Sequence, residues 1–211
     1  MTNAKKLLYI SDLDGTLLDE EGRLPADSIK RLNKLIDKGL NFTIATARNY
    51  DSAYPLLKGL NLKHPVILFN GVYLTEFHTG TNLLFSDFIS VDIINKMISI
   101  ADGHNIEPFI YTYGDKHLVY FRRINNLGAQ AYLDIISSEQ RAHKVDSFSF
   151  PISEHISGFL LIDTQEALEP VNAKLKSLYE NELNIYFAPD VSNPEFCWLQ
   201  SFHQEANKGK M

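Results

Sequence analysis

Residues 7–16 of the chain read LLYISDLDGT, so that a short apolar run, Leu7–Ile10, leads into two aspartates, Asp12 and Asp14. A wholly apolar run of this length is typical of a strand that is buried on both faces of a parallel sheet. Gly15 allows the chain to turn directly after the acids. Open parallel sheets bind ligands beyond the carboxyl ends of their strands, so this stretch predicts a functional carboxylate pair there.

The segments after this stretch alternate between helical and strand patterns. A helix is predicted over Pro25–Lys38, with isoleucines and leucines along one face and Gly39 as its stop. Strands are predicted over Phe42–Ala45 and Val66–Phe69, with a weaker helix between them over Asp51–Leu60. This β-α-β-α-β order predicts an α/β domain with a parallel sheet and right-handed crossovers.

Beyond residue 70 the pattern changes to hairpins and to strands and helices in mixed order. This order predicts an α+β module inserted after the third strand of the parallel sheet. We place the parallel-sheet domain at residues 1–86 plus 203–211 and the inserted domain at residues 87–202.

Composition narrows the class of protein. Of the 211 residues, 45% are hydrophobic and 22% are charged, which is ordinary for a globular protein. The net charge of −6 argues against a nucleic-acid binder. The single cysteine, Cys197, has no partner for an internal disulfide, and no stretch is long and apolar enough to span a bilayer. We therefore expect a cytoplasmic protein that binds neither nucleic acid nor membrane.

The aspartate pair suits phosphoryl transfer. A carboxylate attacks phosphorus when a divalent cation offsets the repulsion between the two anions, and a second carboxyl serves as acid and base. One alternative is an acidic turn that caps a neighbouring segment. Another is a calcium loop, although the later acids of an EF-hand are missing. The position of Asp12 and Asp14 after an apolar strand favours the catalytic interpretation.

Residues 12–18, DLDGTLL, resemble the first motif of the haloacid dehalogenase (HAD) superfamily, in particular the Cof-like hydrolases with a type C2B cap. The resemblance implies a Rossmann-like core with an inserted α+β cap and a flap at residues 15–24. It also implies that Asp12 forms a phospho-aspartyl intermediate and that Asp14 is the general acid and base. Mg²⁺ would be held by the Asp12 side chain and the Asp14 backbone carbonyl.

Two further family motifs bind the phosphoryl group. Thr46 ends the second strand and resembles the second motif, with Arg48 near the phosphate as in many Cof-like relatives. Lys208, with Lys210 as its neighbour, resembles the phosphate-binding lysine of the third motif. Without the resemblance, Thr46 reads as a β-branched residue at a strand end, and Lys208 reads as a solvated lysine of a tail.

Asn70-Gly71 follows the third strand and supports two interpretations. Asn-Gly between two apolar runs is the strongest short signal for a hairpin. Cof-like proteins carry the same dipeptide facing the active site, which implies a role on the substrate side. Both interpretations can hold at once.

The resemblance fails at the C-terminal end. The family continues to a fourth motif of the kind Gly-Asp-x-x-Asn-Asp, whose acids complete the Mg²⁺ site, whereas this sequence ends at Met211. We therefore expect a C-terminally truncated, incomplete core with a weakened metal site. The missing strands of the family lie beside the first strand, so we also expect Leu7–Ile10 to form an exposed apolar edge.

Three functions remain open. The first is a Mg²⁺-dependent phosphatase that acts on a small phosphorylated metabolite, such as a sugar phosphate. The second is a truncated, catalytically impaired protein that binds phosphometabolites without efficient turnover. The third is a phosphomutase or dehalogenase of the same superfamily. The second acid of D-x-D favours phosphoryl chemistry over dehalogenation, and no sequence feature indicates the retained bisphosphate intermediate that a mutase needs. The sequence leaves the substrate and the oligomeric state undecided.

Overall fold

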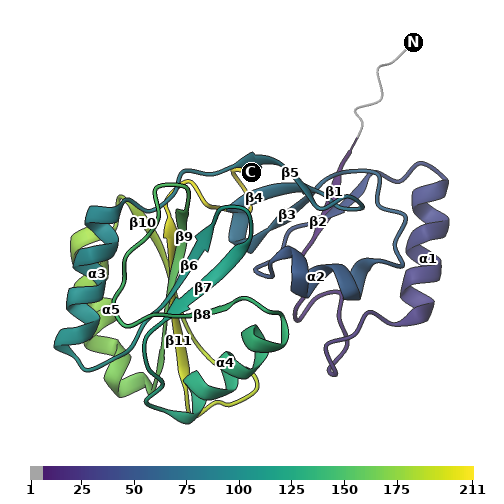
Figure 1. The fold of residues 1–211 in the computed structure, drawn as a ribbon. Coiled ribbons are helices and arrows are strands. Elements are labelled where there is room, and N and C mark those ends of the chain that lie inside the picture. The colour runs from purple at the N-terminus through teal and green to yellow at the C-terminus, as the bar shows by residue number, and fades with distance from the viewer. Residues whose placement is uncertain (1–6) are drawn as a thin grey trace. The chain divides into compact units, whose positions relative to one another are not determined.

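The chain forms two compact units, and the computed structural model describes residues 7–211 of it (Figure 1). The first unit comprises Met1–Ser86 and Glu205–Met211, and the second comprises Asp87–Gln204. The second unit is thus an insertion into the first. No helix among the described residues is long and apolar enough to cross a membrane.

The first unit is an α/β fold with the predicted order of elements. Its elements are β1 (Tyr9–Ser11), α1 (Ala26–Asp37), β2 (Phe42–Ile44), α2 (Tyr50–Leu57), β3 (Val66–Leu68), the 3₁₀ turn η1 (Phe69–Gly71), β4 (Tyr73–Glu76) and β5 (Thr81–Phe85). β1 pairs with β2 in parallel, and a parallel bridge between Ala45 and Ile67 continues the order to β3. β4 and β5 follow as antiparallel strands.

Burial follows position in this order of strands. β2 and β3 have neighbours on both sides, and every one of their residues is buried. β1 is different, because Leu7, Leu8, Tyr9 and Ile10 are each between 49% and 63% exposed. The prediction of a first strand buried on both faces is wrong, and the prediction of an exposed apolar edge is correct. The physical reason is that β1 pairs with β2 alone among the described strands.

The second unit is an α+β fold built on a six-stranded sheet in the order β10-β11-β9-β6-β7-β8. Its elements are α3 (Val91–Gly103), β6 (Phe109–Tyr113), β7 (His117–Phe121), α4 (Leu127–Ser138), β8 (Ala142–Lys144), β9 (His155–Asp163), α5 (Gln165–Tyr179), β10 (Leu183–Pro189) and β11 (Cys197–His203). The strands pair in antiparallel fashion except for β8, which runs parallel to β7.

Helices cover both faces of this sheet (Figure 1). α3 and α5 bury Met97 and Val171 in one core with Ile110 of β6. Phe109 precedes Ile110 in β6, and its ring packs against Tyr132 of α4 with 4.9 Å between the ring centroids. Successive side chains of a strand point to opposite faces, so α4 lies across the sheet from α3 and α5.

A buried polar cluster lies within the second unit. The His117 ring stacks on Tyr111, and its nitrogens lie 3.5 Å from Arg141 Nη1 and 3.5 Å from Ser157 Oγ. Burial, together with the smaller effect of the charge of Arg141, lowers the pKa of His117 from 6.5 to about 3. Glu139 pairs with Arg141 and keeps that buried cation neutralised. His117 is therefore an uncharged part of the core at neutral pH.

This depressed pKa predicts acid sensitivity of the second unit. Between pH 6.5 and 3 the unfolded chain takes up a proton at His117 that the folded chain does not, so stability falls as the pH falls. At pH 5 this loss amounts to about 2 kcal/mol. Between pH 7 and pH 5 we expect the free energy of unfolding of the wild type to fall by about 2 kcal/mol more than that of His117→Gln. Urea unfolding followed by fluorescence of Trp198, the single tryptophan, measures it.

The control for this prediction is His104→Gln, which changes an exposed histidine at the end of α3. It should keep the acid sensitivity of the wild type. Equal losses of stability in all three proteins would show that His117 does not carry the effect.

Candidate active site

The first carboxylate of the pair comes directly after β1 and meets a lysine from the far end of the chain. Asp12 Oδ2 accepts a hydrogen bond from Lys208 Nζ at 2.7 Å, across 196 positions of sequence. Asp12 Oδ1 accepts the backbone N–H of Leu13 at 2.8 Å. Both charged side chains are partly exposed, so the pair is open to a ligand from solvent.

The second carboxylate is held by an arginine from the segment after β2. Arg48 donates from Nε to Asp14 Oδ2 at 3.0 Å and from Nη2 to Asp14 Oδ1 at 2.7 Å. Such a two-bond arrangement fixes the plane of the carboxylate as well as its position. Arg48, which the resemblance places near the phosphate, pairs with the proposed acid in this structure.

Thr46 lies at the same end of the sheet and is fully buried. Its backbone N–H donates to the Ile67 carbonyl at 2.9 Å, and its Oγ1 accepts the Arg48 N–H at 3.1 Å. A hydroxyl both accepts and donates. No hydrogen bond among the described residues uses the proton of this hydroxyl, which leaves it for an incoming oxygen.

The Asn70-Gly71 dipeptide forms the turn between β3 and β4, as predicted for a hairpin. Asn70 has φ 56° and Gly71 has φ 91°, a region that favours glycine. Gly71 is also pressed against another segment, because a Cβ there would lie 2.6 Å from the carbonyl oxygen and 2.7 Å from the nitrogen of Asn207. The turn therefore packs against Asn207, the residue that precedes Lys208.

Asn207 holds the C-terminal segment together by hydrogen bonds, and the sequence did not predict it as a site residue. Its Oδ1 accepts the N–H of Gly209 at 2.8 Å, and its carbonyl accepts the N–H of Lys210 at 3.0 Å. Lys210 itself pairs with Glu205 at 2.9 Å and does not reach the aspartates. The only sequence signal for Asn207 is its place beside Lys208, because its contact with Gly71 joins distant parts of the chain.

The site as a whole contains two anions and two cations in two pairs, Asp12 with Lys208 and Asp14 with Arg48. Among residues 7–211 no group of three or more His, Cys, Asp or Glu side chains is arranged to hold a metal ion. The oxygen donors of Asp12 and Asp14 still suit Mg²⁺, which commonly takes one or two carboxylates and completes its shell with water.

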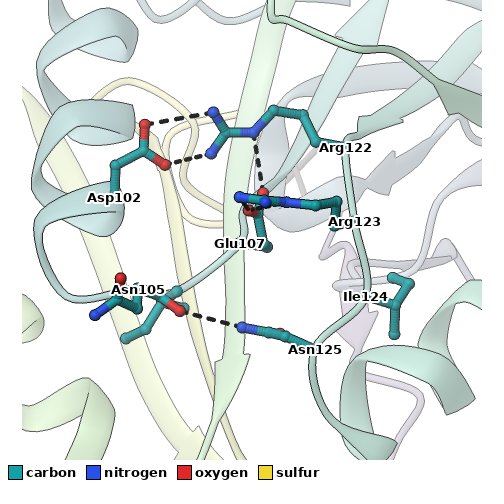
Figure 2. A pocket seen from close by; sticks show the side chains of 8 residues that line it. Asp102, Asn105, Glu107, Arg122, Arg123, Ile124 and Asn125 are labelled. Carbon is teal, nitrogen blue, oxygen red and sulfur yellow. Dashed lines mark hydrogen bonds and ion pairs between the residues drawn. The ribbon is translucent and has the colours of Figure 1, made fainter.

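A cavity of about 410 Å³ lies in the second unit, between the loop before β6 and the loop after β7 (Figure 2). Arg122 donates to Glu107 at 2.9 Å, pairs with Asp102 and lies 4.8 Å from the centre of the Phe148 ring. Arg123 also pairs with Glu107, at 2.6 Å. The charges of the lining thus neutralise one another, and none of the predicted site residues lies there.

The fold and these residues define a class, an α/β protein with an acid pair beyond the first strand of a parallel sheet and an α+β unit inserted after the hairpin. Residues 9–210 match the family model described as haloacid dehalogenase-like hydrolase. The chain therefore belongs to the haloacid dehalogenase-like hydrolase family.

Relatives in this family include named phosphatases. The chain is 33% identical over 109 residues to the pyridoxal phosphate phosphatase YbhA of Escherichia coli, covering 52% of this chain and 39% of that protein. It is 24% identical over 123 residues to the 5-amino-6-(5-phospho-D-ribitylamino)uracil phosphatase YitU of Bacillus subtilis, covering 54% of this chain and 46% of that protein. The matches thus span less than half the length of either relative.

Among solved structures, a haloacid dehalogenase-like hydrolase from Bacteroides thetaiotaomicron has the same fold. It superimposes with a TM-score of 0.71 at 17% identity, covering 97% of this chain and 73% of that chain.

The contact between Gly71 and Asn207 predicts the behaviour of one substitution. We expect Gly71→Ala to destabilise the fold for two reasons, which are strain at φ 91° and a steric clash with the Asn207 backbone. Strain alone costs about 1–3 kcal/mol, and overpacking adds about as much again. Urea unfolding measures the loss, and titration calorimetry with inorganic phosphate measures whether Lys208 remains in place.

Gly39→Ala is the matched control, because Gly39 has φ 99° and nothing lies within 4 Å of its added Cβ. It should show the strain alone and bind phosphate as the wild type does. Equal destabilisation by the two substitutions would contradict the inference that Gly71 positions Asn207.

Proposed function

We propose that the chain hydrolyses a phosphate monoester of a small metabolite through a phospho-aspartyl intermediate on Asp12. The observation that carries this proposal is the contact of Asp12 with Lys208 beside the paired Asp14. Such a site combines a nucleophile and a phosphate-binding cation in direct contact with a second carboxyl two residues after the nucleophile. These are the groups that phosphoryl transfer to a carboxylate needs.

In the first half of the reaction, Lys208 and the Thr46 hydroxyl bind the phosphoryl oxygens. Asp12 attacks phosphorus, the bond from phosphorus to the ester oxygen breaks, and Asp14 gives its proton to that oxygen. In the second half, Asp14 takes a proton from water as the water attacks phosphorus. The bond to Asp12 then breaks, which releases inorganic phosphate and restores both carboxyls.

Two groups of this site change partners when substrate binds. Lys208 moves from Asp12 to the phosphoryl group, which frees the nucleophile. Arg48 likewise exchanges Asp14 for a phosphoryl oxygen, a geometry its planar guanidinium suits. Asn70 and Gly71 line the substrate side of the same turn. We assign Mg²⁺ to the Asp12 side chain and the Asp14 backbone carbonyl, where it would offset the repulsion between carboxylate and phosphate.

The second unit, Asp87–Gln204, is proposed as the cap that selects the leaving group and excludes water. The relatives YbhA and YitU are named for pyridoxal phosphate and for a phosphorylated ribitylaminouracil. Both are small phosphate monoesters. We therefore infer a substrate of that class, such as a sugar phosphate.

A second candidate function is phosphometabolite binding without efficient turnover. One observation favours it, namely that no group of three metal-binding acids, histidines or cysteines exists among the described residues. A weak metal site leaves the repulsion between Asp12 and phosphate in place. Binding through Lys208 and Thr46 would remain.

The test is phosphate release by the chain with and without Mg²⁺. The substrates are pyridoxal phosphate, the ribitylaminouracil phosphate, sugar phosphates and a chromogenic ester. We expect Mg²⁺-dependent release that Asp12→Asn lowers by at least about 10³-fold, because the amide is no nucleophile. Asp37→Asn, at the exposed end of α1, is the matched control and should keep full activity.

Two other outcomes discriminate between the candidates. A folded chain that releases no phosphate, yet binds phosphate in a manner lost in Lys208→Met, would support binding without turnover. Release that survives in Asp12→Asn would remove Asp12 from the mechanism.

A further inference from the structure

The cavity of the second unit has a lining whose acidic oxygens are all occupied, whereas some of its donors are not. All four carboxylate oxygens of Asp102 and Glu107 accept hydrogen bonds from the guanidinium groups of Arg122 and Arg123 (Figure 2). Within residues 7–211, no hydrogen bond uses Arg123 Nη1 or the side-chain amide of Asn105. A molecule that enters this cavity therefore finds N–H donors and no open carboxylate, which favours an anion over a cation.

Glu107 holds Arg123 in place for such an anion. The Glu107 side chain is only 10% exposed, and its Oε1 accepts Arg123 Nε at 3.0 Å and Arg123 Nη2 at 2.6 Å. Its Oε2 accepts Arg122 Nε at 2.9 Å, and Arg122 is itself fixed between Asp102 and the Phe148 ring. A guanidinium carries five N–H donors in a planar fork, so the edge of Arg123 that faces away from Glu107 remains available. Because Arg123 is 79% exposed, a ligand reaches that edge from solvent.

The other walls of the cavity suit the body of a small polar molecule. Asn125 Nδ2 donates to the Asn105 carbonyl at 3.1 Å, which ties the loop before β6 to the loop after β7. The side-chain amide of Asn105 lines the cavity and both donates and accepts. Ile106 and Ile124 add apolar surface. The volume of about 410 Å³ falls within the range of about 300–1,000 Å³ that is usual for small-molecule sites.

The cavity lies away from the point where the chain enters this unit. Its loops precede Phe109, the first residue of β6, and follow Phe121, the last residue of β7. The chain enters at Ile89, which bridges Ile156, and Ile156 pairs with Thr112 near the other end of β6. The strand rise places these two ends of β6 roughly 10 Å apart. A ligand in the cavity therefore contacts a different part of the unit from this entry point.

We propose that this cavity binds a small carboxylate that carries hydroxyl groups. The carboxylate pairs with the outer edge of Arg123, and the hydroxyl groups bond to the amides of Asn105 and Asn125. The charge of the lining selects a monoanion, because the two arginines are already balanced by Asp102 and Glu107. A phosphate dianion would bring a second negative charge to a site with one guanidinium edge to meet it. The proposal does not depend on the proposed function.

Titration followed by two-dimensional ¹H–¹⁵N NMR tests this site, with glycerate and gluconate as the probes. We expect saturable shifts of the backbone amides of residues 105–107 and 122–125 and of the Arg123 Nε–H. Arg123→Gln should weaken binding of the probes by about tenfold or more, because it removes a charge-assisted pair. Arg123→Lys should weaken binding as well, since it keeps the charge and loses the planar fork.

Arg31→Gln is the matched control. Arg31 of α1 is 78% exposed and pairs with Asp27 at 2.7 Å, so it resembles Arg123 in its exposure and in its acidic partner. This variant should bind the probes as the wild type does. Asn105→Asp is a second variant of the site. Asn105 has φ 58°, which aspartate also tolerates, and the new carboxylate should repel the probes.

Binding by the candidate active site is separated from binding by the cavity with Lys208→Met. The same shifts at residues 105–107 and 122–125 are expected in that variant, and their loss would assign the binding to the active site and overturn the proposal. Loss of phosphatase activity has no bearing on these shifts, so failure of the proposed function is distinguished from failure of this one.

Four other results would overturn the proposal. The first is the absence of saturable shifts at these residues up to probe concentrations of tens of millimolar. The second is unchanged binding in both Arg123→Gln and Asn105→Asp, with each variant folded by circular dichroism. The third is an equal loss of binding in Arg31→Gln, which would indicate attraction by overall charge alone. The fourth is tighter binding of inorganic phosphate than of either carboxylate at the same residues.

Discussion

The approach of the Asn207 backbone to Gly71 is the constraint on which the site of the first unit depends. Lys208 is the next residue, and its ammonium contacts Asp12. A side chain at position 71 would occupy the space that the Asn207 backbone fills. The turn between β3 and β4 thus reverses the chain and also packs against the segment that contains Lys208. An inserted unit between Ser86 and Glu205 is compatible with this closure, because closure entropy grows only with the logarithm of loop length.

The two ion pairs matter more for order than for stability. Asp12, Asp14 and their cations are all about a third exposed or more, and pairs of this kind contribute roughly 0–1 kcal/mol. Their physical effect is to orient the Asp12 and Asp14 side chains and to place a cation beside each of them. The same cations are the groups that a phosphoryl oxygen attracts. Weak pairs at a site that exchanges partners are therefore an advantage, because a strong pair would compete with the ligand.

Local patterns predicted the elements of the first unit and the place of its acids. The apolar runs that became β2 and β3, and the acids after the first run, are properties of neighbouring residues. The apolar pattern of Leu7–Ile10 wrongly predicted a strand buried on both faces, since periodicity describes a strand and not its neighbours. The sequence did not predict β8, because its residues Ala-His-Lys show no apolar pattern.

Contacts between distant segments also set the limit of prediction at the site. Arg48 lies on Asp14, Lys210 on Glu205 and Asn207 on Gly71. Two of these contacts, Arg48 with Asp14 and Asn207 with Gly71, join segments that lie far apart in the chain, which no single stretch of sequence encodes. Lys210 and Glu205 are near neighbours, and their pairing is a local contact within the C-terminal segment. The family motifs named Asp12 and Lys208 as partners of one phosphate, and in the structure these two side chains contact each other.

The nucleophile proposed here follows the least protected strand of the sheet. β1 has one neighbour, three residues and side chains open on both faces, whereas β2 and β3 are fully buried. Few buried contacts mean a low free energy for local opening, so β1 belongs to the part of the sheet that opens most easily. Asp12 directly follows this strand, so its contact with Lys208 depends on β1 staying paired. Packing that orders β1 therefore also orders the carboxylate that follows it.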